Sequence, residues 1–230
     1  MDFAGMQSLT LLDFPGKVAC VLFTCGCNLR CPFCHNASLA CGSAEIGYPE
    51  ADVLAFLKKR QGLLDGVVIS GGEPLLHPEL PSFLKKVRAL GYAIKVDTNG
   101  TNPTLLAKLV SDGLVDYVAM DIKNSPAFYA ATTGISKPDI AAITQSRDFL
   151  MSDVVDYELR TTVVDGLHTK ESIAELSQWI AGAKRYFLQA FKDSGDLLAP
   201  SSLSAFDEAQ MNELLEIAKV YVPSAKLRGI

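Results

Sequence analysis

The chain has 230 residues, of which 49% are hydrophobic and 20% are charged, a composition typical of one globular domain. Its net charge of −5 provides no basic field to attract nucleic acid or an anionic membrane surface, so neither is expected as a partner. The N-terminal stretch does not resemble a signal peptide, and the longest apolar runs, such as residues 18–23, are too short to span a membrane. We expect a cytoplasmic protein with a single domain, residues 1–230.

Short apolar runs alternate with segments of helical periodicity along the whole chain. Six strands alternating with helices indicate βαβ units and a parallel sheet, either an open doubly wound sheet or an incomplete barrel. A short further element is expected within residues 220–227. Strands are predicted at residues 18–23, 66–70, 93–97, 117–121, 157–163 and 185–191, and helices at residues 49–59, 79–90, 103–110, 139–151, 170–180 and 206–218.

All six cysteines fall within residues 20–41, which is unlike a disulfide scaffold and favours a metal site. Three of them, Cys27, Cys31 and Cys34, directly follow the first predicted strand with C-x3-C-x2-C spacing. They could fill three corners of a four-iron cluster and leave the fourth iron open. A closed zinc site with His35 as the fourth ligand, or a disulfide framework, stays an alternative on this spacing alone.

The other three cysteines are too few to hold a second four-cysteine cluster. Cys20 lies inside the first strand and is expected to pack as a small buried side chain. Cys25 and Cys41 are given no role. Two of the three histidines, His77 and His168, lie in loop-like contexts and are expected at the surface.

Unusual polar residues lie at or near the carboxyl ends of the predicted strands. Because barrels place their chemistry at the carboxyl ends of the strands, these residues are expected to meet at one rim. Gly71 and Gly72 suit a close approach of the backbone to a ligand, although a strand-to-helix turn needs the same residue types. The rim segments are Ser70-Gly-Gly-Glu-Pro74, Asp97-Thr-Asn-Gly100, Met120-Asp-Ile-Lys123, Arg160-Thr-Thr162, and the pair Gln189 and Phe191.

The cysteine spacing, with the aromatic Phe33 before the last cysteine, resembles the signature of the radical S-adenosylmethionine (SAM) superfamily. This resemblance implies an α/β fold, the incomplete (β/α)6 barrel, and selects it over the doubly wound sheet. It also implies that Cys27, Cys31 and Cys34 hold a [4Fe-4S] cluster whose fourth iron is chelated by SAM. The backbone of His35 is then expected to approach SAM, and its ring is not expected to be a ligand.

Three rim segments, at residues 71–74, 97–98 and 121–123, resemble segments of the SAM site in the same superfamily. Gly71-Gly72-Glu73-Pro74 resembles the segment that binds the methionine amino group through backbone carbonyls. The resemblance further implies that Asp97, Thr98 and Asp121 form an oxygen-lined site, which either holds a monovalent cation or orients SAM.

The remaining rim residues complete the expected cofactor-binding set. The resemblance implies that Lys123 meets the SAM carboxylate, that Arg160 reaches this carboxylate or the cluster region, and that Gln189 belongs to the same site. The residues alone also permit simpler interpretations. Asp97 could cap the following helix, Asn99-Gly100 could be only a turn, Lys123 could be a surface lysine, and Arg160 could be structural.

A finer resemblance covers most of the chain. It implies that SAM is cleaved reductively to form a glycyl radical on a partner protein, with a flavodoxin or ferredoxin as electron donor. The open side of an incomplete barrel could admit a loop of that partner. Segments 9–17, 23–24, 31–36, 121–123, 160–163 and 188–191 are similar to the activating proteins of anaerobic ribonucleoside-triphosphate reductase, in their longer single-domain form.

Other functions fit the same signature. No cysteine-rich, ferredoxin-like insert lies between Cys41 and Pro49, so activases with additional clusters are poor matches. The alternatives are an activase of another glycyl-radical enzyme, and a small-molecule enzyme similar to 7-carboxy-7-deazaguanine synthase. A further one, from a different class, is an iron–sulfur or zinc binding module without catalysis.

Overall fold

The protein is described by a computed structural model at residues 1–193, 195, 197–199 and 203–230. The strands of these residues form a single sheet in which sequence neighbours are also spatial neighbours, in the order β1 to β8. β1 is antiparallel to β2, and every later pair is parallel. The strands are β1 (Gly5–Thr10), β2 (Ala19–Thr24), β3 (Gly66–Gly71), β4 (Ala93–Thr98), β5 (Tyr117–Asp121), β6 (Asp156–Val163), β7 (Tyr186–Ala190) and β8 (Lys226–Arg228).

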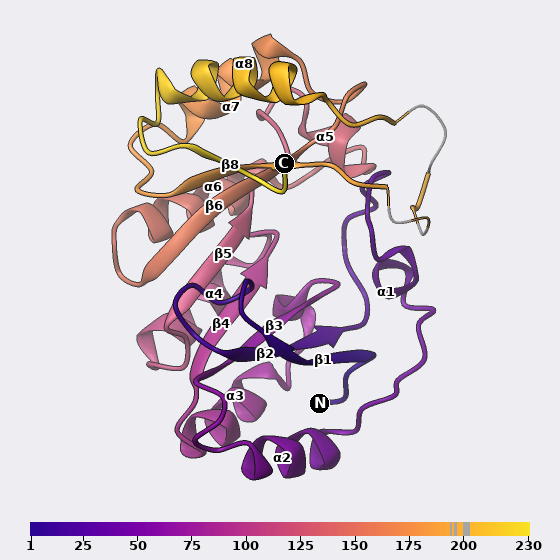
Figure 1. Cartoon of the computed structure of the whole chain (residues 1–230), viewed down its shortest axis with the longest axis vertical. Coiled ribbons are helices and arrows are strands. Elements are labelled where there is room, and N and C mark those ends of the chain that lie inside the picture. Colours follow the sequence, from indigo (N-terminus) through magenta and orange to yellow (C-terminus); the bar gives the residue numbers. More distant parts are fainter. Residues whose placement is uncertain (194, 196, 200–202) are drawn as a thin grey trace.

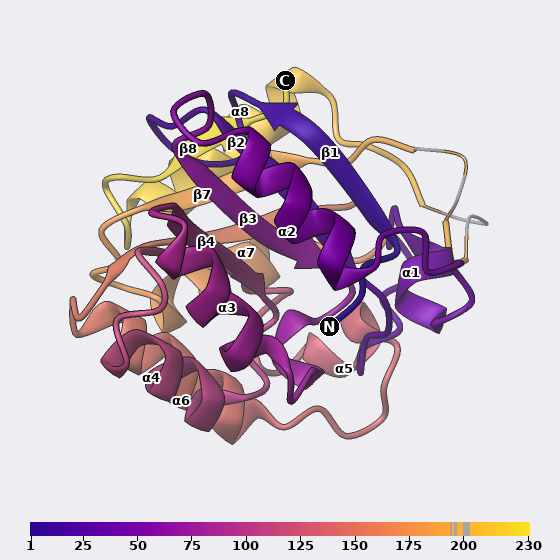
Figure 2. The same cartoon turned by 90° about the horizontal axis from the view of Figure 1, so that it is seen from below.

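The longer helices cover the outer face of the curved sheet, and α2, α3, α4 and α6 lie in a row over it (Figures 1 and 2). The two five-residue helices, α1 and α5, lie apart from this row, on the right in Figure 1. None of the described helices is long and apolar enough to cross a membrane. The helices are α1 (Ala37–Cys41), α2 (Glu50–Lys59), α3 (Leu80–Ala89), α4 (Pro103–Ser111), α5 (Tyr129–Thr133), α6 (Ile140–Met151), α7 (Lys170–Trp179) and α8 (Glu208–Lys219), with a 3-10 helix, η1 (Pro74–Leu76).

The predicted order of the six strands and six helices is confirmed, with bounds that differ by at most two residues. Strands β2 to β7 and their helices are the six units of the incomplete barrel, and β8 is the short element expected near the C-terminus. β1, α1, η1 and α5 were not predicted. Within the described part of the chain the sheet ends at β1 on one side and β8 on the other, without a strand pair that closes the barrel.

The barrel interior is apolar at its base and polar at its rim. Alternate residues of a strand face opposite sides, so Val67 and Ile69 of β3 pack under the helices while Val68 points inward. Val68 meets Phe14, which the β1–β2 loop inserts into the barrel, and Tyr117 of β5. This small cluster fills the base, and the carboxyl ends of the strands are left to polar side chains.

Candidate functional site

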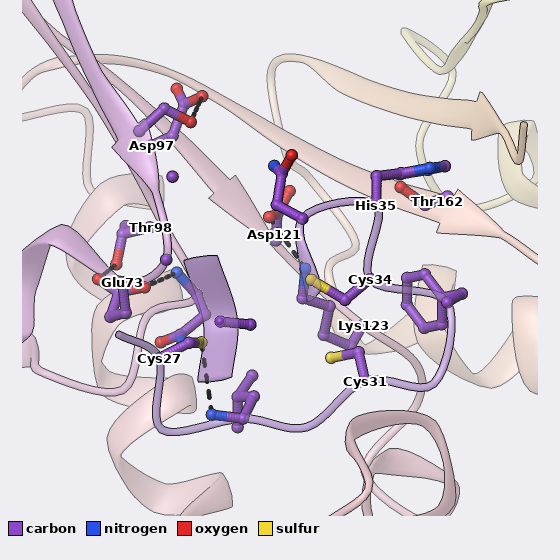
Figure 3. Close-up of a pocket in the computed structure, with 18 of the residues that line it drawn as sticks. Cys27, Cys31, Cys34, His35, Glu73, Asp97, Thr98, Asp121, Lys123 and Thr162 are labelled. Atoms are coloured by element: carbon purple, nitrogen blue, oxygen red, sulfur yellow. Dashed lines mark hydrogen bonds and ion pairs between the residues drawn. The ribbon is translucent and has the colours of Figure 1, made fainter. Parts of the chain in front are cut away.

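A cavity of about 440 Å³ lies at the carboxyl ends of the parallel strands (Figure 3). Its walls come from strands β3 to β7 and from the cysteine loop after β2, as expected for a barrel site. Pro74, which begins η1 and is buried, is the one predicted site residue that does not line it. The predicted residues that do are Cys27, Cys31, Phe33, Cys34, His35, Gly71, Gly72, Glu73, Asp97, Thr98, Asp121, Lys123, Arg160 and Gln189.

The three cysteines of the motif face the same cavity from one loop (Figure 3). A turn brings Cys34 back toward Cys31, because the Cys34 N–H donates to the Cys31 carbonyl at 3.0 Å. The Cys27 sulfur accepts from the Leu29 N–H at 3.4 Å. Burial raises the pKa of Cys27, and raises that of Cys31 to about 11. Burial therefore favours the thiol forms of Cys27 and Cys31, and their thiolates need the positive charge of a metal centre.

The two alternatives for the cysteines do not agree with this geometry. A zinc site requires His35 and the sulfurs to surround one ion, yet no three His, Cys, Asp or Glu side chains in the described ranges are arranged that way. The His35 ring instead stacks on Phe191, with centroids 5.5 Å apart. All six cysteines are free thiols, so the disulfide alternative is wrong. In a four-iron cluster each cysteine binds a different iron, so the three sulfurs need not surround a single ion.

The glycines after β3 are needed for packing against the cysteine loop. The Gly72 N–H donates to the Thr24 carbonyl at 2.9 Å, and the Glu73 N–H donates to the Gly26 carbonyl at 2.8 Å. A Cβ on Gly72 would lie 2.0 Å from the Gly26 oxygen, and one on Gly71 would lie 2.4 Å from the Thr24 nitrogen. At these glycines the turn after β3 thus closely approaches the cysteine loop of the same chain, next to the cavity.

Glu73 joins the turn after β3 to the end of β4. Its carboxylate is buried and accepts from the Leu75 N–H, the Thr98 hydroxyl and the Asn99 N–H at 3.0, 2.8 and 2.6 Å. Burial raises the pKa of Glu73 to about 7, against the effect of these three donors. The Thr98 hydroxyl therefore has its hydrogen-bond acceptor within the protein, at Glu73.

Asn99 has a part in the site that the sequence analysis did not assign to it. Its side-chain nitrogen donates to Oδ1 of the Asn28 side chain at 2.9 Å and lies 3.8 Å from the Cys27 sulfur. The interpretation of Asn99-Gly100 as only a turn is therefore incomplete. Asn99 directly follows Asp97 and Thr98 at the rim, and this position could have indicated a role in the site. Its contact with Asn28, which lies 71 residues away in the cysteine loop, could not be predicted from the sequence.

Charged side chains from β4, β5 and β6 meet across the cavity. Arg160 donates through Nε to Asp121 at 2.5 Å, and its Nη2 lies 3.2 Å from Asp97. Lys123 donates to the other Asp121 oxygen at 2.9 Å. Burial would raise the pKa of Asp121, but Arg160 and Lys123 outweigh it and hold the pKa well below its usual value. This cluster also includes Lys95, which is paired with Asp97.

The structure decides among the simpler interpretations of Lys123, Asp97 and Arg160. Lys123 is largely buried and ion-paired, so its interpretation as a surface lysine is wrong. Asp97 lies inside β4, and the following helix α4 is capped by Asn102, which accepts from the Leu105 N–H at 3.1 Å. Arg160 does form structural ion pairs, and its guanidinium also lines the cavity.

The structure corrects the prediction for His168 and adds Asp13 and Ser70 to the residues of the cavity. His168 was expected at the surface but is 2% exposed, because both of its ring nitrogens have hydrogen-bond partners in the protein. Cys20 is buried in β2, as predicted. Asp13 and Ser70 also line the cavity. Asp13 belongs to the segment 9–17 that carried the finer resemblance.

Comparison with known proteins identifies the family. Residues 21–145, more than half of the chain, match the Radical SAM superfamily. The chain belongs to this superfamily. The matched range contains the cysteine loop and the rim segments of β3, β4 and β5. Radical SAM proteins use a [4Fe-4S] cluster and SAM, and three thiols on one loop that face a shared cavity fit such a cluster.

The relatives of this radical SAM protein indicate its type. It is 29% identical to a Methanocaldococcus jannaschii protein assigned as a glycyl-radical enzyme activating enzyme, over 99% of this chain and 95% of that protein. It is 33% identical to the pyruvate formate-lyase-activating enzyme of Staphylococcus epidermidis, over 52% of each chain. It is therefore an enzyme of the glycyl-radical-activating type. A shorter match, 40% identical, covers 34% of this chain and 30% of the 7-carboxy-7-deazaguanine synthase of Halobacterium salinarum.

Solved structures agree with this radical SAM fold. The crystal structure of a radical SAM methyltransferase from Sphaerobacter thermophilus superimposes with a TM-score of 0.72 over 96% of this chain and 68% of that chain. The two sequences are only 14% identical. This likeness concerns the partial barrel alone.

Proposed function

We propose that this radical SAM enzyme activates an anaerobic ribonucleoside-triphosphate reductase by forming a glycyl radical on it. The observation that carries the proposal is the placement of the three motif cysteines and the rim residues around one cavity. The activating type is supported by a relative that matches nearly the whole chain. The reductase as target is supported by the similar segments 9–17, 160–163 and 188–191.

We assign the cofactor sites to the residues that line the cavity. Cys27, Cys31 and Cys34 would hold the [4Fe-4S] cluster, which supplies one electron for the reductive cleavage of bound SAM to methionine and a 5′-deoxyadenosyl radical. The backbone of segment 71–74 would accept hydrogen bonds from the methionine amino group. Phe33, His35 and Gln189 would contact the rest of the SAM molecule. The side-chain Oε1 of Gln189 is buried and has no hydrogen-bond partner among the described residues, so it can accept a hydrogen bond from a ligand.

One part of the cavity, where the charged side chains of β4 to β6 meet, favours a carboxylate. Three basic side chains, Lys95, Lys123 and Arg160, face two acidic ones, Asp97 and Asp121, so this cluster carries one excess positive charge. Lys123 and Arg160 line the cavity and would bind the SAM carboxylate, while Asp121 holds both of them in place. Because these groups are already fixed by ion pairs, binding would cost little side-chain entropy.

The partner would reach the cavity through the open part of the barrel. The sheet ends at β1 and β8, and Asp13 of the β1–β2 loop lines the cavity. A loop of a large glycyl-radical enzyme could enter there and place its glycine near the SAM site. A reduced flavodoxin or ferredoxin would supply the electron.

The cofactor assignment is tested by anaerobic reconstitution with iron and sulfide. We expect about four iron atoms per chain and a reduced-cluster EPR signal that changes when SAM is added. Cys31→Ala should lose this signal and SAM cleavage, whereas Cys41→Ala, outside the motif, should keep both. A zinc-loaded protein, or an EPR signal that SAM leaves unchanged, would contradict the assignment.

The target is tested by incubating the reduced enzyme and SAM with an anaerobic ribonucleoside-triphosphate reductase. A glycyl-radical doublet in the EPR spectrum of the reductase is the expected result. A doublet only on a different glycyl-radical enzyme would correct the target. SAM cleavage coupled to turnover of a small molecule, with no doublet, would favour an enzyme similar to 7-carboxy-7-deazaguanine synthase.

A further inference from the structure

Lys95 is a buried lysine inside the barrel. It lies on β4, opposite Val68 of β3 and Tyr117 of β5, one inward-facing position below Asp97. Its side chain is 2% exposed, and its Nζ lies 2.5 Å from Oδ1 of Asp97. A buried ammonium is costly unless it is paired, so this ion pair is a specific feature of the site.

Lys95 supports the site from below and does not touch its contents. Among the described residues it is not part of the cavity lining, whereas its partner Asp97 is. The second Asp97 oxygen accepts from the Ser70 hydroxyl at 3.0 Å and lies 3.2 Å from Arg160 Nη2. The carboxylate of Asp97 therefore connects the buried ammonium to the guanidinium that faces the cavity.

The monovalent cation predicted from the sequence does not fit this arrangement. Its expected ligands were the oxygens of Asp97, Thr98 and Asp121. The two Asp97 oxygens are engaged as described, and the two Asp121 oxygens accept from Arg160 and Lys123. The Thr98 hydroxyl donates to Glu73 at 2.8 Å. A bound Na⁺ or K⁺ would have to displace basic side chains that already supply the positive charge.

We propose that Lys95 is a positioning residue whose ammonium takes the place of a monovalent cation. It neutralises Asp97 from the barrel interior, and Asp97 in turn fixes Arg160 toward the cavity. The inference rests on the proposed function in so far as Arg160 binds SAM. The replacement of an external cation by the Lys95 ammonium does not depend on SAM binding.

The wild-type protein gives the first test. SAM binding by the reconstituted enzyme, measured by equilibrium dialysis, should be the same in Na⁺, K⁺ and choline salts at equal ionic strength. The thermal unfolding midpoint of the cluster-free protein should also be the same in the three salts. A requirement for Na⁺ or K⁺ in either measurement overturns the proposal.

Two variants of Lys95 give the second test. Lys95→Ala leaves a space beside Asp97 that a small cation can enter, whereas Lys95→Met removes the charge but fills the space. We expect ammonium or K⁺ to raise the unfolding midpoint of Lys95→Ala relative to tetramethylammonium, which is too large to enter. The midpoints of Lys95→Met and of the wild type should not respond.

The same variants also connect Lys95 to the site. In choline salts, Lys95→Ala should bind SAM about ten- to a hundredfold more weakly than the wild type, and ammonium should restore part of the loss. Lys95→Met should be weakened without rescue. Equal SAM affinity of Lys95→Ala and the wild type in choline salts overturns the proposal. So does an equal effect of ammonium on Lys95→Ala and Lys95→Met. If the wild type binds no SAM, the proposed function fails, while the cation response of the unfolding midpoints still decides the role of Lys95.

Discussion

His168 links two loops below the rim through both of its ring nitrogens. Nδ1 lies 3.1 Å from the Val164 nitrogen, and Nε2 lies 2.8 Å from the Lys123 carbonyl oxygen. Because a backbone N–H can only donate, Nδ1 is assigned as the acceptor and Nε2 as the protonated nitrogen, which donates to Lys123. The neutral ring thus holds the backbone at Lys123, whose side chain faces the cavity.

Replacing His168 should change how stability depends on pH. Burial lowers the pKa of His168 below its usual value of 6.5. As the pH falls below about 6.5, the unfolded chain therefore takes up the proton first, and stability is lost. We expect the contribution of His168 to the free energy of unfolding to decrease between about pH 7 and pH 5, whereas Glu73, with its raised pKa of about 7, changes stability in the opposite direction. His168→Gln, which keeps one acceptor and one donor, should lack the His168 contribution, so its stability should fall less or rise more than that of the wild type on acidification, as measured by urea titrations at several pH values.

His35 remains in both proteins, so the difference between their slopes isolates His168. Equal slopes would show that His168 does not titrate in this way. His168→Leu, which breaks both hydrogen bonds, should additionally weaken SAM binding about tenfold, as expected for a residue that supports a ligand-binding group.

Single residues could be predicted where they end a strand of the parallel sheet. Asp97, Asp121 and Arg160 were placed at one rim because strand polarity alone brings them there. His168 was not assigned to the site because its hydrogen-bond partners are defined by the tertiary structure. Lys95 was missed although its partner Asp97 is two residues away on the same strand, because the sequence does not show that this lysine is buried. Nothing in the sequence around His168 indicates that a carbonyl 45 residues away will accept its proton.

The turn after β3 and the entry to the cysteine loop form one interlocked element. Two backbone hydrogen bonds join them, and Gly72 lies against the carbonyl of Gly26. The Gly26 and Cys27 N–H groups are in turn bonded to carbonyls of α1, at Leu39 and Ala40. The first cysteine is thus held from both sides by backbone contacts, which gives the loop a defined position before any metal binds.

Gly72→Ala should disturb the cysteine loop. The added Cβ would lie 2.0 Å from the Gly26 oxygen, and neither backbone can yield without breaking its hydrogen bonds. We expect a loss of about 1–3 kcal/mol in the free energy of unfolding, and a lower iron content after reconstitution. Gly47→Ala is the matched control, because its Cβ would meet only the Ala4 carbonyl, at 3.9 Å. Similar iron contents in the two variants would argue against this role of Gly72.

The elements that were predicted and those that were missed differ in length and environment. Strand β2 and most of β3 are apolar runs, and β4 to β7 keep mainly apolar residues at the alternate positions that face the helices. β1 has three exposed residues in a row and reads as a loop. Helices α1 and α5 have only five residues each and are held by tertiary hydrogen bonds, such as that of the Arg30 N–H to the Thr133 carbonyl at 2.8 Å.

At the scale of the whole molecule, ion pairs inside the barrel connect strands that are not all neighbours. Arg160 of β6 contacts Asp121 of β5 and Asp97 of β4. Lower in the barrel, Arg228 of β8 donates two hydrogen bonds to Glu158 of β6, at 2.8 and 3.0 Å. An incomplete barrel has no closing strand pair, so these pairs contribute to holding its curvature.

The upper pairs should make stability sensitive to acid. Burial would raise the pKa of Asp97 and Asp121, but their basic partners outweigh it and lower both below the usual 3.8. A lowered folded-state pKa gives stability that is complete above about pH 4 and is lost as the pH falls through the folded-state value. At pH 7, Asp121→Asn should therefore be less stable than the wild type by about 3 kcal/mol, because two buried cations lose their shared partner.

This difference should shrink as the pH falls below about 4, because the carboxyl of the unfolded wild type then takes up a proton, and the ion pairs themselves are lost at the lower folded-state pKa. Urea unfolding of the cluster-free proteins at neutral and acidic pH measures it. Glu213→Gln, which removes an exposed ion pair with Lys170, should match the wild type at both pH values. A difference between Asp121→Asn and wild type that stays constant on acidification would mean that the mutation acts through packing. The charges of Asp97, Asp121 and Arg160 would then orient the site without stabilising the barrel.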